Sequence, residues 1–597
     1  MCGIIGSFTT SKDLRMQLSL KSIAHRGPDS QGEWTNPDGN IWFGHTRLSI
    51  IDLSSAGHQP MIDSSGNFCI VFNGEIYNHL SLRSLLPNVA WRGHSDTETL
   101  VELFAEMGVS MLPLLKGMFA FTIVNINTGE LFLVRDRFGI KPLYYSQNEV
   151  GLAFCSELRP LLKLSPSNIF SSEALAEYLS FGRLPGSGQL LGSIFSMSTA
   201  SYIHVNQQGE LTETIWWSGI TDSIATVETR SEAVKLVKVA VETAVHEHMI
   251  ADVDVGVFLS GGIDSAIITR LSAQHLNKRP ETFTIGFDIN SLDERTKALR
   301  IATLAETKHH FLEVNADQCF LWIMEAIQKM DSPSVDALNT YVVSKAVKSM
   351  GIKVALSGLG GDELFGGYPS FNQVPQLSYL RFLPVSIRNQ FIKLLPSNIQ
   401  DKLIDLRSFS KVDLTVARRR FNPVKNLTAF GLSDNKPLLP ASPESYDTMA
   451  TISWAEIYSY MSPMLLRDSD QMSMSVGLEI RIPFLDHTLV ETALQIPQQF
   501  KKGKGSKPLL CEAFSGILPK EIVEAPKKGF SLPMDQWIRG PLERFTYDNL
   551  KLASAQLDSD LPLKQWKEFK EGRLHWTRVW QLAVLANWSK THEVALK

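Results

Sequence analysis

The sequence has no long apolar run, and this absence excludes a membrane-spanning helix of ordinary length. No stretch approaches the roughly 18 consecutive apolar residues that such a helix needs. The first residues, MCGIIGSFTT, also lack the basic leader and following apolar stretch of a signal peptide. We therefore expect a soluble, cytoplasmic protein.

Cysteine is scarce, and its spacing excludes two classes of small stabilised fold. The chain has 5 cysteines among 597 residues, and none forms a CxxC pair. This spacing argues against a disulfide framework and against a zinc cluster. We expect most of the cysteines to be ordinary core residues, with Cys2 as the exception because of its position.

Neither sign of charge is in large excess. The net charge is -4 and the pI is about 6.4, so the chain as a whole does not attract nucleic acid or an anionic membrane. We expect small-molecule substrates, no nucleic-acid partner and no membrane partner, and the sequence leaves a homodimer open. Because single cores stop growing near roughly 250 to 300 residues, the chain should contain at least two.

The stretch from Val255 to Arg270 reads VGVFLSGGIDSAIITR. A short apolar run, then Ser260, Gly261 and Gly262, then a helical apolar pattern predict a strand, a tight turn and a helix. Such a turn can hold a phosphate on backbone N–H groups and a helix N-terminus. It is not a Walker A loop, because the required lysine is absent. For Ser-Gly-Gly alone, an ordinary strand-to-helix turn remains the alternative interpretation.

Further strands follow, each with a polar or glycine-rich end. ETFTIGF ends near Ile285, and GIKVALSGLGGDELFGGY places Ser357 and Gly358 after another strand. Alternating strands and helices predict an α/β domain with a mainly parallel sheet, whose ligands lie at the carboxyl ends of the strands. The carboxylates of Asp264 and Asp362 suit Mg²⁺, and helix capping is the alternative role for both.

Cys2 follows the initiator methionine directly. If Met1 is removed, the thiol and a free α-amine share one residue. The amine has a pKa of about 7.7 to 8, so it can accept the thiol proton near neutral pH. Position alone favours a cysteine at a tolerant chain end, so the catalytic interpretation depends on the motifs that follow.

Polar clusters between the next strand-like runs contain the groups that a glutamine substrate needs. Arg47 offers a cation for the α-carboxylate, and Glu75 with Asp96 offers anions for the α-amine. Asn73 and the N–H of Gly74 offer donors for the oxyanion that forms when a thiolate attacks the amide. Taken singly, each residue also fits a surface ion pair or a hairpin turn.

The motifs MCGIIG, HRGPDS, GHTRLSIIDL, NGEIYN, SDTE and RDRFGIKPLYY resemble, in this order, the class II glutamine amidotransferase domain. The resemblance implies the αββα sandwich of the N-terminal-nucleophile hydrolases over residues 2–200, followed by a linker at 201–230. It implies that Cys2 is the nucleophile and that Asn73 and Gly74 form the oxyanion hole. The glutamine contacts that it implies are Arg47, Leu48, Ile51, Asn73, Gly74, Glu75 and Asp96.

The motifs LSGGIDS, TIGF, SGLGGDELFGGY, LLRDSDQMSMSVGLEIRIPFLDH and PKKGFSLPMDQW resemble, again in order, the synthetase domain of the glutamine-hydrolysing asparagine synthetases. This implies a PP-loop ATP pyrophosphatase domain over residues 231–597, with Mg²⁺ near Asp264 and Asp362. The string PKKGFS places Lys527 on the family's catalytic lysine, with Lys528 as the alternative. The implied ATP contacts are Leu259, Ser260, Gly261, Gly262, Asp264, Ser265, Ile285, Ser357 and Gly358.

The resemblance weakens between Met330 and Asn339, where better-known asparagine synthetases carry Glu-Thr-Tyr-Asp. Here Asp331 takes the place of the glutamate that acts on the attacking ammonia, one methylene shorter. Because the motifs of both domains are otherwise present, we expect a glutamine-dependent asparagine synthetase that forms asparagine, glutamate, AMP and pyrophosphate. The alternative acceptor is another carboxylate, such as a uronic acid in surface-polysaccharide biosynthesis.

Other functional classes fit the sequence less well. An amide-forming cyclase of the β-lactam synthetase kind would lack the nucleophilic cysteine, and a silent nutrient sensor would have lost catalytic residues. An RNA-modifying PP-loop protein would need a basic surface. The helical insert at 369–450 contains Arg418, Arg419 and Arg420, which we interpret as a solvated helix face rather than a polyanion site.

Overall fold

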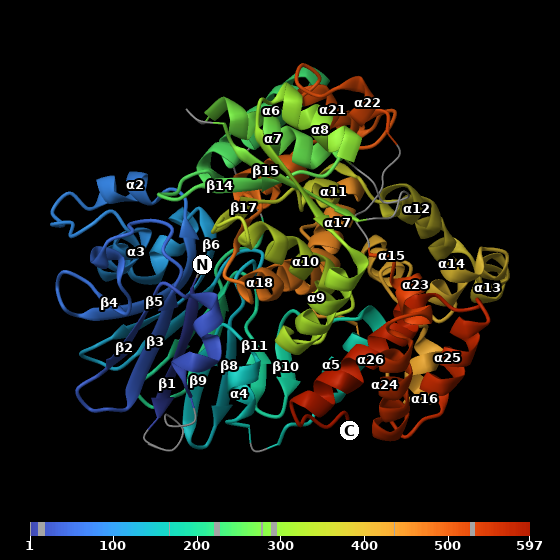
Figure 1. Ribbon diagram of the computed structural model, residues 1–597, viewed down its shortest axis with the longest axis horizontal. Coiled ribbons are helices and arrows are strands. Elements are labelled where there is room, and N and C mark those ends of the chain that lie inside the picture. The colour runs from blue at the N-terminus through green and yellow to red at the C-terminus, as the bar shows by residue number, and fades with distance from the viewer. Residues whose placement is uncertain are drawn as a thin grey trace.

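The structure is a computed structural model in which an antiparallel sandwich is followed by a parallel-sheet domain and a set of helices (Figure 1). The predicted catalytic lysine, Lys527, and its alternative, Lys528, lie outside the described residues. The structure describes residues 2–9, 18–165, 167–219, 227–275, 279–287, 295–434, 436–525 and 532–597.

The first sheet of the sandwich has seven strands in the order β10-β11-β8-β9-β1-β3-β2, and all neighbours are antiparallel. The N-terminal strand β1 lies between β9 and β3, with Gly3 opposite Thr46, so Cys2 emerges at the end of an interior strand. The strands are β1 (Gly3–Thr9), β2 (Ser30–Thr35), β3 (Ile41–Arg47), β8 (Tyr144–Asn148), β9 (Gly151–Cys155), β10 (Gly188–Leu191) and β11 (Ile194–Ser196).

The second sheet has six strands in the order β13-β12-β7-β6-β5-β4. Residues 201 to 215, expected to begin a linker, are part of this sheet. Tyr202 pairs with Val134, and alternate side chains of β12 are buried against the sandwich core. The strands are β4 (Met61–Ile62), β5 (Phe68–Ile76), β6 (Gly117–Asn125), β7 (Leu131–Arg135), β12 (Ser201–Val205) and β13 (Leu211–Ile215).

Apolar side chains from both sheets fill the space between them, among them Ile4, Phe43, Val71 and Leu133. The outer face of the six-stranded sheet packs against α3 (Asp96–Met107), and helices that include α5 (Ser172–Phe181) cover the seven-stranded sheet. This is the predicted αββα sandwich. The shorter elements of this region are η1 (Leu20–Arg26), η2 (Ser55–Gly57), α2 (His79–Leu82), η3 (Arg83–Leu85), η4 (Gly108–Leu114) and α4 (Arg159–Leu162).

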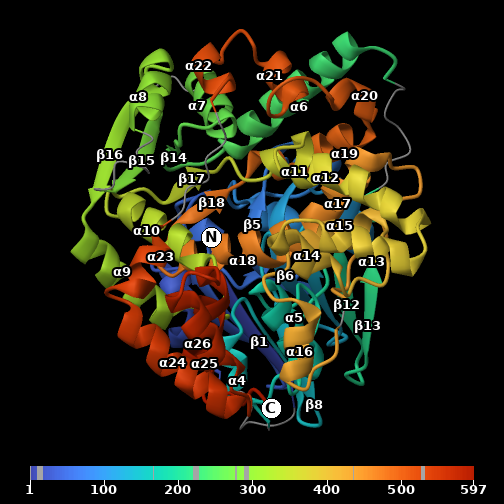
Figure 2. The ribbon, with the colours of Figure 1, turned by 90° about the vertical axis from the view of Figure 1, so that its right-hand side faces the viewer.

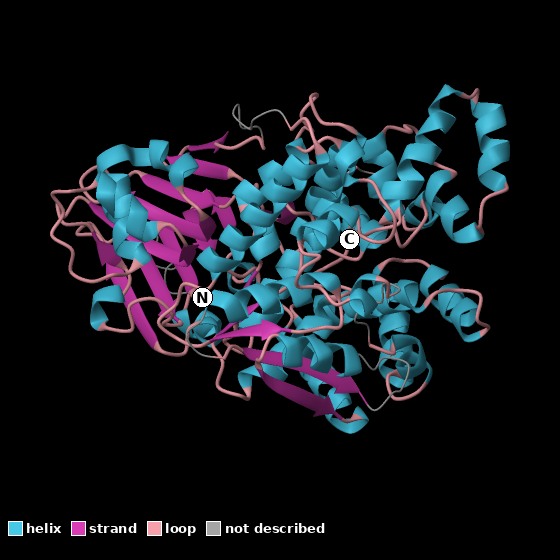
Figure 3. Cartoon of the chain, turned by 90° about the horizontal axis from the view of Figure 1, so that it is seen from above, coloured by secondary structure: helices cyan, strands magenta, loops and turns pink. Residues whose placement is uncertain are grey.

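A separate sheet of five parallel strands forms the centre of the second domain, as predicted (Figure 3). Its order is β16-β15-β14-β17-β18, so the chain moves outward from β14 in one direction and then returns to the other side of it. Ligands of open parallel sheets bind at such a reversal point. The strands are β14 (Val255–Phe258), β15 (Glu281–Phe287), β16 (Lys308–Val314), β17 (Val354–Leu356) and β18 (Glu479–Arg481).

Helices surround the parallel sheet, and further helices form the C-terminal part of the chain (Figure 2). None of the described helices is both long enough and apolar enough to cross a bilayer. The helices around the sheet are α6 (Arg230–His248), α7 (Ile263–His275), α8 (Arg295–Leu304), α9 (Ala316–Lys329), α10 (Ala337–Lys348), α11 (Gly361–Phe365), α18 (Arg467–Met474), η8 (Pro483–Leu485), α19 (His487–Gln495), α20 (Gln498–Lys501), α21 (Pro508–Ala513) and α22 (Lys520–Val523). The last helices are α23 (Met534–Arg539), α24 (Glu543–Gln556), α25 (Leu561–Lys570) and α26 (Trp576–Thr591).

The stretch 369–450 is helical and has a small core of its own that includes Phe371, Ile392 and Leu403. The expectation that its arginines are solvated is wrong for two of them. Arg419 bonds Glu456 at 2.7 Å and Arg420 bonds Asp434 at 2.5 Å, because carboxylates of the same domain face them, and that of Glu456 is buried. The helices are α12 (Ser370–Leu377), η6 (Ser378–Phe382), α13 (Val385–Lys393), α14 (Ser397–Leu403), α15 (Lys411–Arg418) and α16 (Val424–Ala429), followed by α17 (Thr448–Glu456) and the π-helix η7 (Ile457–Leu466).

Candidate active sites

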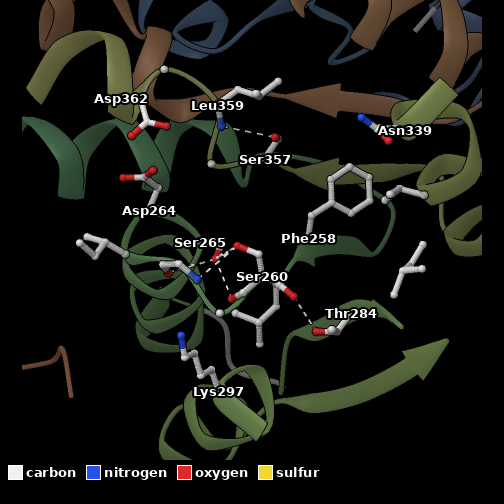
Figure 4. A pocket seen from close by; sticks show the side chains of 18 of the residues that line it. Phe258, Ser260, Asp264, Ser265, Thr284, Lys297, Asn339, Ser357, Leu359 and Asp362 are labelled. Atoms are coloured by element: carbon white, nitrogen blue, oxygen red, sulfur yellow. Dashed lines mark hydrogen bonds between the residues drawn. The ribbon is translucent and has the colours of Figure 1, made fainter. Parts of the chain in front are cut away.

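A cavity of about 400 Å³ opens at the carboxyl ends of β14, β15 and β17, where the sheet order reverses. Its walls come from segments that lie far apart in the sequence (Figure 4). The structure brings the entire predicted ATP set together around this cavity: Leu259, Ser260, Gly261, Gly262, Asp264, Ser265, Ile285, Ser357 and Gly358, with Asp362 beside them.

The turn after β14 is held by its own serines. The Ser265 hydroxyl lies 3.0 Å from the carbonyl oxygen of Ser260, and the N–H of Gly262 donates to the Ser260 hydroxyl at 3.3 Å. Because α7 begins at Ile263, its first N–H groups have no partner within the helix and form one wall of the cavity. A Cβ at Gly261 would lie 2.8 Å from Cβ of Lys297, so a larger residue would displace that lysine.

A lysine that the sequence did not single out joins the two predicted metal carboxylates. Nζ of Lys507 contacts Asp264 and lies 2.7 Å from Oδ1 of Asp362. The lysine is buried, which would lower its pKa, but the two carboxylates outweigh burial and the pKa is raised. Lys507 is therefore a fixed positive charge beside Asp264 and Asp362 in the cavity wall. Its position could not be predicted, because it is distant in the sequence from both carboxylates.

We expect Lys507→Met to lower ATP–pyrophosphate exchange at least about tenfold, because the cavity loses a positive charge that can face phosphate oxygens. The exchange assay with saturating acceptor measures this, and glutaminase activity without ATP should be unchanged. Lys504→Met is the matched control, since Lys504 is an exposed residue of the same loop. Equal exchange rates in the two variants would contradict the assignment.

Neutral polar groups also line the cavity. Asn339 and Thr340 come from the start of α10, and Ser469 comes from α18. Figure 4 shows Asn339 across the cavity from Asp264 and Lys297. Among the described lining residues the cations are Lys297 and Lys507, and Lys507 is paired with Asp362.

Asp331 does not line this cavity. Its carboxylate turns toward the sandwich domain, where it accepts hydrogen bonds from the N–H groups of Leu158 at 2.8 Å and Arg159 at 3.0 Å. Burial, together with the nearby Glu157, raises the pKa of Asp331. The structure thus shows a contact between the two domains at the position where the sequence predicted a group acting on ammonia.

For Asp331→Asn we expect the free energy of unfolding to fall by about 1 to 3 kcal/mol, because an amide cannot accept both backbone hydrogen bonds as well as the carboxylate. Chemical denaturation measures the change, with the exposed Asp317→Asn as control. Unchanged stability together with selective loss of ammonia-dependent amide formation would instead support the catalytic role of Asp331.

In the sandwich domain, Cys2 lies beside Asn73, one of the two residues predicted to form the oxyanion hole. The N–H of Cys2 donates to Oδ1 of Asn73 at 3.1 Å. Nδ2 of Asn73 is buried and has no hydrogen-bond partner among the described residues. A Cβ at Gly74 would lie 2.1 Å from the carbonyl oxygen of Met118, so only glycine fits between β5 and β6 at this point. The arrangement leaves an unused donor beside the thiol, as an oxyanion hole requires.

The electrostatics around the thiol are mixed. Burial raises the pKa of Cys2, whereas the N–H of Leu48 and the guanidinium of Arg47 act to lower it. Arg47 is fixed by backbone carbonyls: it bonds Ser54 at 2.9 Å, Ile51 at 3.4 Å and also Asp52. The structure therefore brings the predicted residues Arg47, Leu48 and Ile51 to the Cys2 site.

The two predicted amine ligands also lie here, and both are buried. Burial raises the pKa of Asp96 to about 6, and Oδ2 of Asp96 accepts the N–H of Ile76 at 3.0 Å. Glu75 contacts Arg481 of the parallel-sheet domain at 3.3 Å. Arg481 in turn accepts the N–H of Ser357, a residue of the ATP cavity, on its carbonyl oxygen at 2.9 Å. One residue thus touches elements of both sites, and no sequence pattern indicated it.

Two protein-family models match the chain. The glutamine amidotransferase domain matches residues 1–217, and asparagine synthase matches residues 236–590. The chain belongs to the asparagine synthase family. It is therefore an ATP-dependent amidotransferase of the ligase class.

Known relatives align with nearly the whole length of this chain. Asparagine synthetase (glutamine-hydrolyzing) 1 of Bacillus subtilis is 30% identical over 91% of this chain and 89% of its own. A putative asparagine synthetase of Mycobacterium tuberculosis is 30% identical over 95% of this chain and 92% of its own. Amidase chry2 of Gibberella zeae is 26% identical, with coverages of 89% and 86%.

Proposed function

We propose that the chain converts a carboxylate to an amide by two coupled reactions. At the first site the thiolate of Cys2 attacks the side-chain amide of glutamine, Nδ2 of Asn73 donates to the oxyanion, and ammonia leaves. Water then hydrolyses the glutamyl thioester, which releases glutamate and restores the thiol of Cys2. At the second site the acceptor carboxylate attacks the α-phosphorus of ATP and pyrophosphate leaves. Ammonia then attacks the acyl-adenylate and AMP leaves. The observation that carries this proposal is the cavity at the strand ends, which gathers the whole predicted ATP set.

We propose aspartate as the acceptor, which makes the products asparagine, glutamate, AMP and pyrophosphate. The names of the relatives from Bacillus subtilis and Mycobacterium tuberculosis support this choice. The RNA-binding alternative would use the basic residues of the insert, and two of them, Arg419 and Arg420, are paired with carboxylates.

Magnesium fits the carboxylates of Asp264 and Asp362. Both are hard oxygen donors, and the buried cation of Lys507 between them shows that the pair can hold positive charge. When bound, the ion would offset the charge of the triphosphate. Lys527 remains the proposed cation for the adenylation transition state. Within the described residues, no group of three or more His, Cys, Asp or Glu forms a metal cluster.

A uronic acid is the second candidate acceptor, and the lining of the cavity favours it. Aspartate has a second carboxylate that needs a cation, and Lys507 is already paired with carboxylates, whereas the described lining also offers the neutral groups of Asn339, Thr340 and Ser469. Hydroxyl and amide groups of this kind suit the hydroxyls of a sugar ring.

ATP–pyrophosphate exchange with each acid decides between the candidates. The protein is assayed with aspartate, glucuronic acid and galacturonic acid in separate reactions, with glutaminase activity recorded in the same preparation. Exchange with aspartate alone supports the asparagine synthetase proposal. Exchange with a uronic acid alone replaces it with the second candidate. No exchange with any acid, in protein that still hydrolyses glutamine, would refute both acceptors.

A further inference from the structure

The segment from Tyr379 to Leu394 presents an exposed apolar surface, which we call the 379–394 surface. Tyr379 is 72% exposed, Phe382 70% and Leu394 82%, and Val385 and Phe391 are also more than half exposed. Apolar side chains of this size are normally buried, and exposed apolar patches mark interaction sites. The surface comprises η6, the connection after it and α13.

The inner side of this segment is already occupied. Ile392 of α13 is fully buried and packs in the small core of the insert with Phe371 and Leu403. Figures 1 and 2 both place α13 at an edge of the molecule. The exposed apolar side chains therefore face outward from a supported helix.

The charge of this region differs from that of the whole chain. Arg381 and Lys393 are exposed within the surface, whereas the guanidinium of Arg388 lies over Phe409 of the insert core. The sequence contains no acidic residue between Glu363 and Asp401. The surface is locally positive although the net charge of the protein is -4. Aromatic and aliphatic side chains interleaved with basic residues are typical of segments that lie in the plane of a membrane interface.

We propose that the 379–394 surface docks the protein on an anionic phospholipid bilayer. The apolar side chains would enter the headgroup boundary, and the basic residues would face the lipid phosphates. A symmetric contact between two copies is a poorer fit, because it would place the same cations opposite one another. The expectation of no membrane partner came from the net charge, which averages out this local pattern.

Docking here would bring the bilayer near the ATP cavity. Tyr368 lines that cavity, and α12, which begins two residues later, has 8 residues and leads to the surface. A helix of this length spans about 12 Å. The proposal goes beyond the proposed function, since membrane docking does not depend on which carboxylate is amidated.

Vesicle flotation of the full-length protein tests the proposal. Vesicles of phosphatidylcholine alone are compared with vesicles that also contain phosphatidylglycerol, at low and high salt. We expect flotation only with the anionic vesicles and a decrease with salt, because salt screens the exposed charges. Phe382→Ser/Leu394→Ser should lower the bound fraction at least tenfold, and Arg381→Gln/Lys393→Gln should lower it severalfold. Leu321→Ser is the control, since Leu321 is 65% exposed on α9.

Glutaminase activity of each variant confirms that it is folded. Absence of flotation by the folded wild-type protein, or equal loss with Leu321→Ser, would overturn the proposal. Light scattering after gel filtration provides the other decisive result. If the Phe382→Ser/Leu394→Ser variant is a monomer, the wild type is a dimer and vesicles do not bind, the surface is an interface between copies and the proposal is wrong.

Discussion

Cys2→Ala should abolish amide formation from glutamine and leave amide formation from ammonia unchanged. Removing a catalytic nucleophile typically costs at least about 1000-fold in rate. We expect the ammonia-dependent reaction to use only the cavity at the parallel sheet, whose described lining residues include none from the Cys2 site. Amide product is measured for the wild type and the variant with each nitrogen source, at saturating ATP and acceptor.

Cys319→Ala is the control for Cys2→Ala. Cys319 is also fully buried, but it lies on α9, away from Asn73 and Arg47. Both reactions should continue in this variant. Equal loss of the glutamine and ammonia reactions in Cys2→Ala would show that the residue supports the structure rather than attacking glutamine.

The lining of the cavity at the parallel sheet could be predicted residue by residue because its determinants are local. The strand, the Ser-Gly-Gly turn and the helix start lie in one continuous stretch, and the ends of parallel strands necessarily share one edge of the sheet. Asn73 and Gly74 could be predicted for the same reason, since both lie in one strand beside the chain end that carries Cys2.

What could not be predicted depends on contacts between distant segments. Lys507 and Arg481 acquire their roles from carboxylates that only the tertiary fold brings near them. Asp331 occupied a plausible place in a motif, but the backbone after α9 turns its carboxylate toward Leu158. Residues 201 to 230 were assigned to a linker, and the position of the sandwich's last strands within that range depends on the pairing of β12 with β7, which lies far away in the sequence.

Charged side chains are buried at the contact between the two domains. Ion pairs across this contact offset the cost of removing them from water. Arg26 is fully buried; it donates to the carbonyl oxygen of Cys2 at 3.1 Å and to Asp470 of α18 at 2.8 Å. Its guanidinium also lies 3.3 Å from Glu157. Despite its burial, the two carboxylates raise the pKa of Arg26 above the ordinary arginine value. A single side chain thus links the backbone of Cys2 to the parallel-sheet domain.

Arg26→Met should therefore lower the free energy of unfolding by about 3 kcal/mol, because removing one partner of a buried ion pair leaves the others unsatisfied. This value is at the low end of the usual cost of breaking a buried ion pair, because Lys141 remains 3.6 Å from Asp470 and can still pair with it. Glutamine-dependent synthesis should fall more than ammonia-dependent synthesis, because Cys2 loses a backbone contact. Denaturant unfolding and the two activity assays measure these changes.

Two further variants separate the ion pair from general destabilisation. Arg26→Met/Asp470→Asn should recover part of the lost stability, because replacing both partners removes the unpaired buried charge. Arg544→Met, which breaks an exposed pair with Asp548 at 3.7 Å, should change stability by less than about 0.5 kcal/mol. If the double variant is as unstable as the sum of the single variants, Arg26 and Asp470 are not coupled. The link between the two domains would then have to rest on Glu157 and on backbone contacts such as that of Asp331.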